Sequence, residues 1–156
     1  MPPSAEEARE ASARLAADRK AMDEYNQNVI KEFRANGGKV GGMMQGRPVI
    51  LITSTGAKTG RELTRPLVYS RDGSRCVIVA SYAGGPHNPP WYHNLVKNPV
   101  CTVEIGTEKF RARATPTTGA ERERLFTQHG AAMPIFNEYK EKTSRQIPVF
   151  VLERID

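Results

Sequence analysis

The sequence predicts one mainly β domain (α+β), a small six-stranded antiparallel barrel with an N-terminal helix and short helices at its rim. Short apolar runs rich in β-branched residues alternate with hairpin-type turns, and these runs outnumber the segments that could serve as crossover helices. Closing the sheet also removes exposed strand edges. The 156 residues suit a single domain, which we divide into the N-terminal helix (1–38) and the barrel (39–156).

The first helix is predicted from Ser4 to about Ala35. Ser4 and Glu7 have the spacing of a capping box, in which each side chain satisfies a free N–H of the first turn. Gly37 and Gly38 are expected to end the helix. Only its second half carries an apolar stripe at helical spacing, made by Met22, Tyr25, Val29 and Phe33. The first half is expected to be a solvated helix.

Six strands are predicted, over 49–53, 63–70, 75–81, 100–105, 108–115 and 147–152. Asp72-Gly73 is a hairpin signal, so strand 63–70 is expected to pair with strand 75–81. Pro66 cannot donate to a sheet ladder, which favours an edge position or a bulge.

Three short helices follow from start signals later in the chain. Pro90 suits the first position of a helix over 91–97. Thr118 and Glu121 have capping-box spacing and open a helix to about 129. A last helix is predicted over 134–142.

Composition excludes several classes of protein. Cys76 and Cys101 lie far apart among β-branched residues, so they are expected in the core, and the three histidines lack metal-ligand spacing; we expect no metal. No signal peptide or membrane-spanning stretch is apparent, which favours the cytoplasm. The net charge of +6 attracts anions. Nucleic acid is disfavoured as a partner, because the aromatic residues do not line a basic sheet face.

The segment 53–61 combines hydroxyls, glycines and cations after a predicted strand. Glycine lets backbone N–H groups approach an anion, and cations neutralise its charge. This composition indicates phosphate binding; the alternative is an ordinary exposed hairpin turn. The candidate ligands are Ser54, Thr55, Lys58, Thr59 and Arg61, with Arg65 as a further anion contact.

The segment 80–94 is rich in Gly and Pro and holds the single Trp of the chain, Trp91. An aromatic wall with backbone donors is typical of a pocket for a flat cofactor. The alternative is that Trp91 packs in the core. Further along, Tyr139 could donate a hydrogen bond or proton to a substrate, or be only a half-buried helix residue.

Three motifs together resemble a known family. They are Thr-Ser-Thr-Gly-Ala-Lys-Thr-Gly-Arg (53–61), Asn-Pro-Pro-Trp-Tyr-His-Asn (88–94) and Arg-Gln-Ile-Pro-Val-Phe (145–150). The sequence resembles, over about residues 25–153, the deazaflavin (coenzyme F420)-dependent nitroreductase and quinone reductase family of mycobacteria and related actinobacteria. The resemblance implies a split β-barrel, related to flavin and pyridoxamine-phosphate oxidases, that binds reduced F420, an 8-hydroxy-5-deazaflavin.

The resemblance also implies roles for particular residues. Lys58 and Arg61 would meet the phosphate, and Arg61 or Arg65 would take over from an arginine that the family often carries where Leu63 stands. Tyr139 and Tyr69 would face the substrate. The residues expected around the ring and the cofactor tail are Pro66, Leu67, Ala80, Ser81, Tyr82, Gly84, Gly85, Asn88, Trp91, Tyr92, His93 and Asn94.

The resulting hypothesis is hydride transfer from the reduced deazaflavin to a quinone, an activated enone or a nitroaromatic compound. Two alternatives stay open at this point: an oxidoreductase that uses FMN on the same barrel, and a cofactor-binding protein without turnover. A monomer or a homodimer is expected. The N-terminal helix could cover the substrate pocket or touch a membrane surface weakly, because its first half lacks a bulky apolar face.

Overall fold

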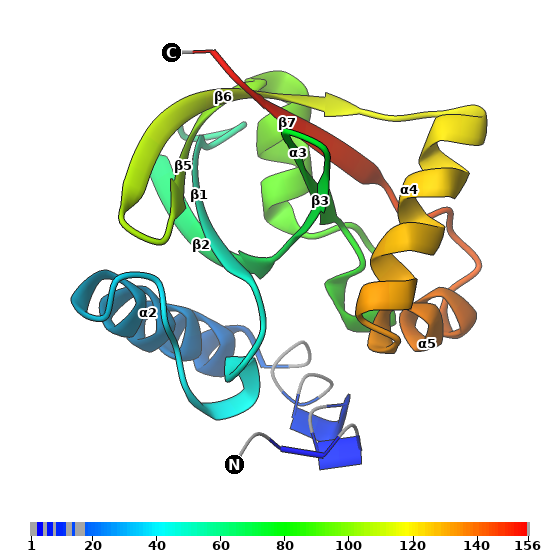
Figure 1. Cartoon of the computed structure of the whole chain (residues 1–156), viewed down its shortest axis with the longest axis horizontal. Coiled ribbons are helices and arrows are strands. Elements are labelled where there is room, and N and C mark those ends of the chain that lie inside the picture. The colour runs from blue at the N-terminus through cyan, green and yellow to red at the C-terminus, as the bar shows by residue number, and fades with distance from the viewer. Residues whose placement is uncertain (1–2, 5, 8, 12–13, 15–17, 156) are drawn as a thin grey trace.

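The computed structural model describes residues 3–4, 6–7, 9–11, 14 and 18–155. One antiparallel sheet of seven strands, in the order β2-β1-β5-β6-β7-β4-β3, curls around a core, as Figure 1 shows. The helices lie around this curled sheet. The elements are α2 (Arg19–Ala35), η1 (Gly42–Met44), β1 (Val49–Thr55), β2 (Glu62–Val68), β3 (Ser70–Asp72), β4 (Arg75–Val79), η2 (Tyr82–Gly84), α3 (Pro90–Lys97), β5 (Val100–Ile105), β6 (Glu108–Pro116), α4 (Gly119–Ala132), α5 (Ile135–Lys142) and β7 (Val149–Arg154).

The two edges of the sheet are consecutive in the chain. β2 pairs only with β1 and β3 only with β4, yet Tyr69 alone separates β2 from β3. The predicted strand 63–70 is therefore two strands, which makes seven instead of six. Its expected pairing with 75–81 was wrong for residues 63–68, because β2 pairs with the preceding strand; Ser70–Asp72 do pair with Arg75–Val77. Pro66 lies on an edge strand, as predicted.

Apolar side chains pack on both faces of the curled sheet. The inner cluster fills the barrel and includes Ile52, Ile78, Val103 and Phe150. A second cluster lies under α4 and α5, and a smaller third one joins α2 to β1 through Phe33 and Leu51. Cys76 and Cys101 are buried free thiols, as predicted.

The N-terminal helix differs from its prediction. Ser4 Oγ accepts the Glu7 N–H at 3.1 Å, so the first capping contact is confirmed. However, the backbone of Asp18 is extended, and its carboxylate caps a new helix, α2, by accepting the Ala21 N–H at 3.1 Å. A single helix over 4–35 was therefore wrong, since a capping residue interrupts it. Residues 5, 8, 12–13 and 15–17 of that predicted helix lie outside the described part of the chain.

The C-terminal end of α2 is firmly attached to the barrel. The Gly38 N–H donates to Phe33 O at 2.8 Å, in the manner of a Schellman cap. A Cβ at Gly38, whose φ is +94°, would lie 2.7 Å from Gly106 Cα, so only glycine fits this approach. Arg34 donates two hydrogen bonds, of 3.1 and 2.9 Å, to the buried carboxylate of Glu104 on β5.

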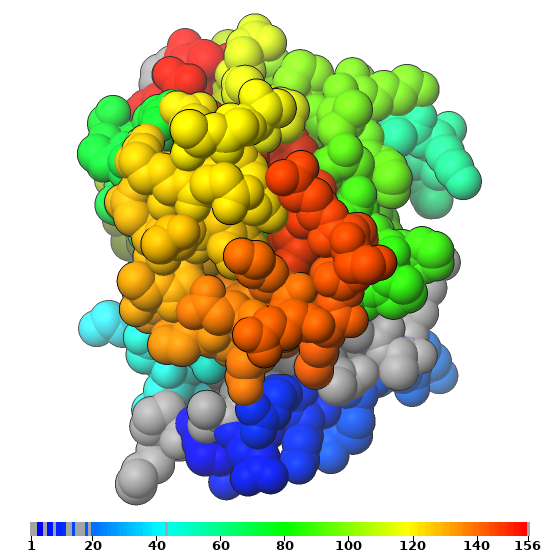
Figure 2. All heavy atoms as spheres, turned by 90° about the vertical axis from the view of Figure 1, so that its right-hand side faces the viewer, coloured from blue at the N-terminus to red at the C-terminus, as the bar shows by residue number. Residues whose placement is uncertain are grey.

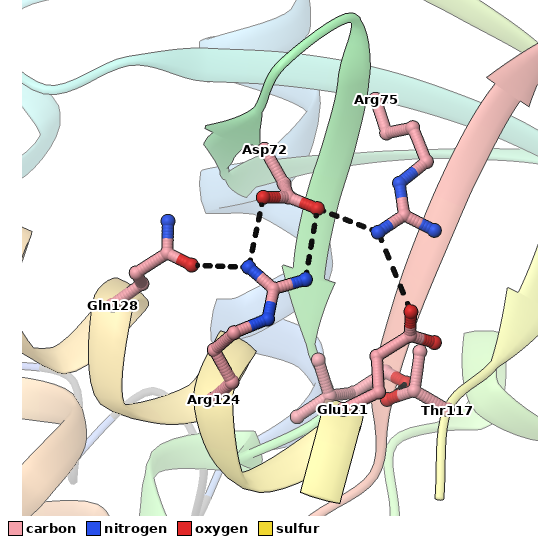
Figure 3. A network of polar contacts seen from close by, with 7 residues as sticks. Asp72, Arg75, Thr117, Glu121, Arg124 and Gln128 are labelled. Atoms are coloured by element: carbon pink, nitrogen blue, oxygen red, sulfur yellow. Dashed lines mark hydrogen bonds and ion pairs between the residues drawn. The ribbon is translucent and has the colours of Figure 1, made fainter.

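A charged network holds the β3–β4 hairpin on α4 (Figure 3). Both oxygens of Asp72 accept from Arg124 of α4, at 3.0 and 3.2 Å, and one also accepts from Arg75 at 2.5 Å. Arg75 lies 3.5 Å from Glu121. The expected capping box of α4 was wrong in part: the helix does begin after Thr118, but the Thr118 side chain makes no capping hydrogen bond.

The Asp72 network predicts acid-dependent stability. Hydrogen bonds from Arg124, then from Arg75, lower the pKa of Asp72 from 3.8 to about 2. Its ionised form therefore stabilises the fold above about pH 4 and loses this effect as the pH falls through 2. We expect Asp72→Asn to lower the melting temperature at pH 7, and the difference from the wild type to shrink towards pH 2.

Glu108→Gln is the matched control, because the Glu108–Arg154 pair is largely exposed (side chains 68% and 55%) and should contribute little. Equal changes in melting temperature for D72N and E108Q at pH 7 would contradict the structural role of the network.

Candidate functional site

A cleft of about 240 Å³ opens where the two edges of the sheet meet. It lies between α2, the edge strand β2, η2, the start of α3 and α5. The described residues that line it are Met22, Asp23, Tyr25, Asn26, Met44, Arg47, Arg65, Pro66, Leu67, Val68, Val79, Ser81, Tyr82, Ala83, Pro89, Pro90, Trp91, Phe136 and Tyr139.

Seven of the residues predicted from the sequence line this cleft. They come from four separate elements and are Arg65, Pro66, Leu67, Ser81, Tyr82, Trp91 and Tyr139. The structure adds a wall formed by α2, for which covering the pocket was one of two expectations, and by η1 with the segment that follows it, which was missed. The apolar stripe through Met22 and Tyr25 was the available signal for this wall, but a stripe does not say whether a helix covers a core or a cleft.

The turn that carries Ser81 and Tyr82 has an unusual backbone. Tyr82 and Ala83 have φ values of +49° and +55°, which non-glycine residues adopt rarely, and Gly84 follows with +76°. A Cβ at Gly84 would lie 2.9 Å from Lys142 Cβ and 3.0 Å from Tyr139 O, so the turn packs directly on α5. Strained backbone of this kind persists where the surroundings enforce it, and it clusters at functional sites.

Arg145 enforces this conformation. Its guanidinium donates to the carbonyl oxygens of Gly85 (3.0 Å), Ala80 (3.2 Å) and Ser81 (2.6 Å), and to Asn88 Oδ1 (2.7 Å). Burial lowers the pKa of Arg145. One side chain thus ties the segment before β7 to four points of the turn. Asn88 and Gly85, predicted to bind the cofactor, hold Arg145 and lie outside the cleft lining.

The predicted phosphate segment forms the exposed β1–β2 hairpin loop. Lys58, Thr59 and Arg61 are exposed, and the side chains of Lys58 and Arg61 make no ion pair with any described residue. The loop itself is held by α3: Asn94 Oδ1 accepts the Ala57 N–H at 2.9 Å, and Lys97 Nζ donates to Ala57 O at 2.7 Å.

Several other predicted residues lie outside the cleft lining. Tyr69 is buried in the barrel core, and its ring faces the Arg71 guanidinium at 5.5 Å. Ala80 is fully buried and donates its N–H to Pro148 O at 2.9 Å. The rest of this group are Ser54 and Thr55 on β1, Gly84 against α5, and Tyr92, His93 and Asn94 on α3, of which only His93 is exposed.

A buried histidine supports the α5 wall from behind. His129 has no exposed surface, and its Nδ1 lies 2.7 Å from Ser70 Oγ. Its ring packs edge-on against Phe136 (centroids 4.4 Å apart), which packs against Tyr139 in the same way at 5.5 Å. Phe136 and Tyr139 both line the cleft. The histidine thereby connects β3 to the two aromatic side chains of α5.

Clusters of metal ligands and membrane-spanning helices are both absent from the residues that the structure describes. Within this part of the chain, no three His, Cys, Asp or Glu side chains gather as metal ligands would. None of its helices has the length and apolar character needed to cross a bilayer.

Removing Arg145 is expected to destabilise the fold and the turn together. Arg145→Lys cannot reach all four acceptors, and carbonyl groups left without partners should cost about 2–4 kcal/mol in urea unfolding. Arg113→Gln, on the exposed face of β6, is the control and should change stability by less than ~0.5 kcal/mol. A loss in R145K no larger than in R113Q would contradict the role of the clamp.

His129 predicts a second dependence of stability on pH. Burial lowers its pKa from 6.5 to about 4, so the unfolded chain binds a proton in this range while the folded protein does not. The fold should therefore lose about 3 kcal/mol from this residue as the pH falls from 7 to 4. In His129→Gln that slope should vanish, and in His87→Gln, where the histidine is exposed, it should remain. Parallel curves for wild type and H129Q would contradict the assignment.

Comparisons with known proteins identify the family of this chain. A family model described as F420H(2)-dependent quinone reductase matches residues 25–154. An F420H(2)-dependent quinone reductase of Mycobacterium tuberculosis (strain ATCC 25618 / H37Rv) is 36% identical over 128 residues, which cover 78% of this chain and 85% of that protein.

Solved structures give the same result. An F420-H2 dependent reductase (FDR-A) is 38% identical, with a TM-score of 0.64 over 69% of this chain and 95% of that one. A structure described as a domain-swapped dimer is 32% identical, with a TM-score of 0.66 over 85% and 98%. The family model over residues 25–154 and these relatives together show that the chain belongs to the F420H2-dependent quinone reductase family.

Proposed function

We propose that this protein is an F420H2-dependent reductase that transfers a hydride from the reduced deazaflavin to an electron-poor small molecule, with a quinone as the favoured acceptor class. The observation that carries this proposal is the cleft. It unites the turn at Ser81, the Pro66–Leu67 edge, Trp91 and Tyr139 in a member of this family.

The residues present fit the cofactor that the family name implies. A flat ring needs apolar and aromatic walls, which Trp91, Pro66 and Leu67 supply. A phosphate needs cations near it, and the β1–β2 hairpin loop offers the exposed side chains of Lys58 and Arg61 at the surface. α3 connects the cleft to this loop, since Trp91 in its first turn lines the cleft and Asn94 accepts a hydrogen bond from the loop.

The protein's part in the reaction is positioning and electrostatics. When bound, reduced F420 supplies the hydride. The cleft holds the acceptor flat between the β2 edge and α5 and shields it from water. Tyr139 is 7% exposed and lines the cleft, so its phenol can donate to the acceptor oxygen on which negative charge develops.

The first experiment titrates the intrinsic fluorescence of Trp91 with F420 and, separately, with FMN. Because Trp91 is the only tryptophan and lines the cleft, we expect quenching by F420. Oxidation of F420H2 should then depend on an added quinone such as menadione. Quenching by FMN alone would favour an oxidoreductase that uses FMN on the same barrel. Binding of F420 without quinone-dependent oxidation of F420H2 would favour a cofactor-binding protein without turnover.

Two tyrosine variants separate the residues predicted to act on the acceptor. Tyr139→Phe keeps the ring and should lower kcat roughly 10²-fold if the phenol stabilises developing charge. Tyr69→Phe should have a much smaller effect, because Tyr69 lies in the barrel core. A larger loss of kcat in Tyr69→Phe than in Tyr139→Phe would show that Tyr69, and not Tyr139, acts on the acceptor.

Other expectations stay predictions. Location in the cytoplasm and weak contact with a membrane surface would be tested by fractionation. Whether the protein is a monomer or a homodimer would be tested by light scattering.

A further inference from the structure

Two arginines on the cleft lining have no carboxylate partner. Arg47 and Arg65 both line the cleft, and neither forms an ion pair with any residue in the described part of the chain. Arg65 uses one N–H to donate to Thr64 O at 3.1 Å; no hydrogen bond is found for the Arg47 side chain among the described residues. Most of the other lining groups are apolar. A guanidinium in such surroundings binds an anionic oxygen favourably, because a charge-assisted hydrogen bond would compensate its partial loss of water.

The backbone at Arg47 is fixed before any ligand binds. The Arg47 N–H donates to Met44 O at 3.0 Å, and the next residue, Pro48, accepts the Tyr69 N–H at 3.1 Å. The second of these bonds joins this segment to the junction of β2 and β3, beside the edge strand that carries Arg65. The backbone of both arginines is therefore held in place before a ligand binds, which reduces the conformational entropy lost on binding.

Tyr25 adds a third polar group to this wall. Its ring lines the cleft, and its buried hydroxyl has no hydrogen-bond partner among the described residues. Burial raises the pKa of Tyr25, and the positive charge of Arg47 opposes that rise. The only acidic residue on the described lining is Asp23, which leaves the wall with a positive balance.

We propose that Arg47 and Arg65 form a subsite for a carboxylate carried by the acceptor, so that the enzyme prefers quinones with an acidic side chain. This inference rests on the proposed reductase function and adds a substrate class to it. The carboxylates of the cofactor tail are the other source of the same chemistry. We favour the acceptor because Arg47 lies on the wall beside α2, whereas two of the three cations predicted to meet the cofactor phosphate, Lys58 and Arg61, lie outside this lining and only Arg65 is part of it.

The test uses two naphthoquinones that differ in charge and by one methyl group: 2-methyl-1,4-naphthoquinone with a propanoate at position 3, and its methyl ester. With the intact protein and F420H2, we expect kcat/KM for the acid to exceed that for the ester about tenfold, the size of one charge-assisted hydrogen bond to a partly buried arginine. Arg47→Gln should bring this ratio close to one. Arg47→Lys, which keeps the charge, should retain part of it, and Arg113→Gln should leave it as in the wild type.

Binding is measured beside turnover. The quenching of Trp91 by the acid and by the ester should show the same preference in equilibrium Kd, and R47Q should lose it. The Kd of F420 should change less in R47Q than the Kd of the acid does. A larger loss of F420 affinity would show that Arg47 serves the cofactor and would overturn the proposal, as would equal kcat/KM values for acid and ester in the wild type. If neither quinone nor menadione is reduced, the proposed function fails, while the two Kd values still decide whether the subsite exists.

Discussion

One constraint shapes this molecule: the two outer strands of its sheet are joined by a single residue. A chain that leaves one edge at Val68 and begins the other at Ser70 cannot lie in an open sheet, so the sheet must curl until its edges meet at Tyr69. The curled sheet encloses one core. It also leaves a seam between its two edge strands, where strand pairing is interrupted. The cleft lies along this seam, which explains why residues of one edge strand with opposite orientations, Arg65 and Pro66, both reach it.

The turn at Ser81, α5 and α3, which surround the cleft, are held by residues that lie outside the cleft lining. Arg145 holds the strained turn, and His129 supports the aromatic residues of α5. α3 connects the cleft to the cation-bearing loop, since Trp91 stands at one end and Asn94 binds that loop. At the other end of the chain, the N-terminal residues lie against α5 in Figure 2, where Arg9 pairs with Glu138. The shape of the cleft thus depends on residues such as Arg145, His129 and Asn94, which lie outside its lining.

The sequence was sufficient for the fold class, for most of the strands and helices, and for seven of the nineteen described residues that line the cleft. Hairpin turns, β-branched runs and the prolines around Trp91 act over a few residues, so they predicted most strands and helices correctly. The break at Tyr69 could not be predicted, because the pairing of β2 with β1 is decided by the whole sheet. The capping role of Asp18 was missed because its neighbours favour a continuous helix. Arg47 was missed for a different reason: its place in the cleft depends on contacts made by distant segments, which no local pattern records.

The attachment of α2 has a consequence for how the cleft adapts to its contents. Arg34 and Gly38 fix the C-terminal end of this helix to the barrel, and the buried side chains of Ile30 and Phe33 pack its second half on β1. Met22, which lines the cleft, lies twelve residues before Arg34, or about 18 Å along the helix axis. The residues that hold α2 on the barrel lie in its second half, so a slight rotation of the helix about them displaces Met22 more than it displaces Phe33. The width of the cleft on this side therefore depends on the angle of α2, so relatives could accommodate acceptors of different bulk by adjusting that angle and leaving the strands unchanged.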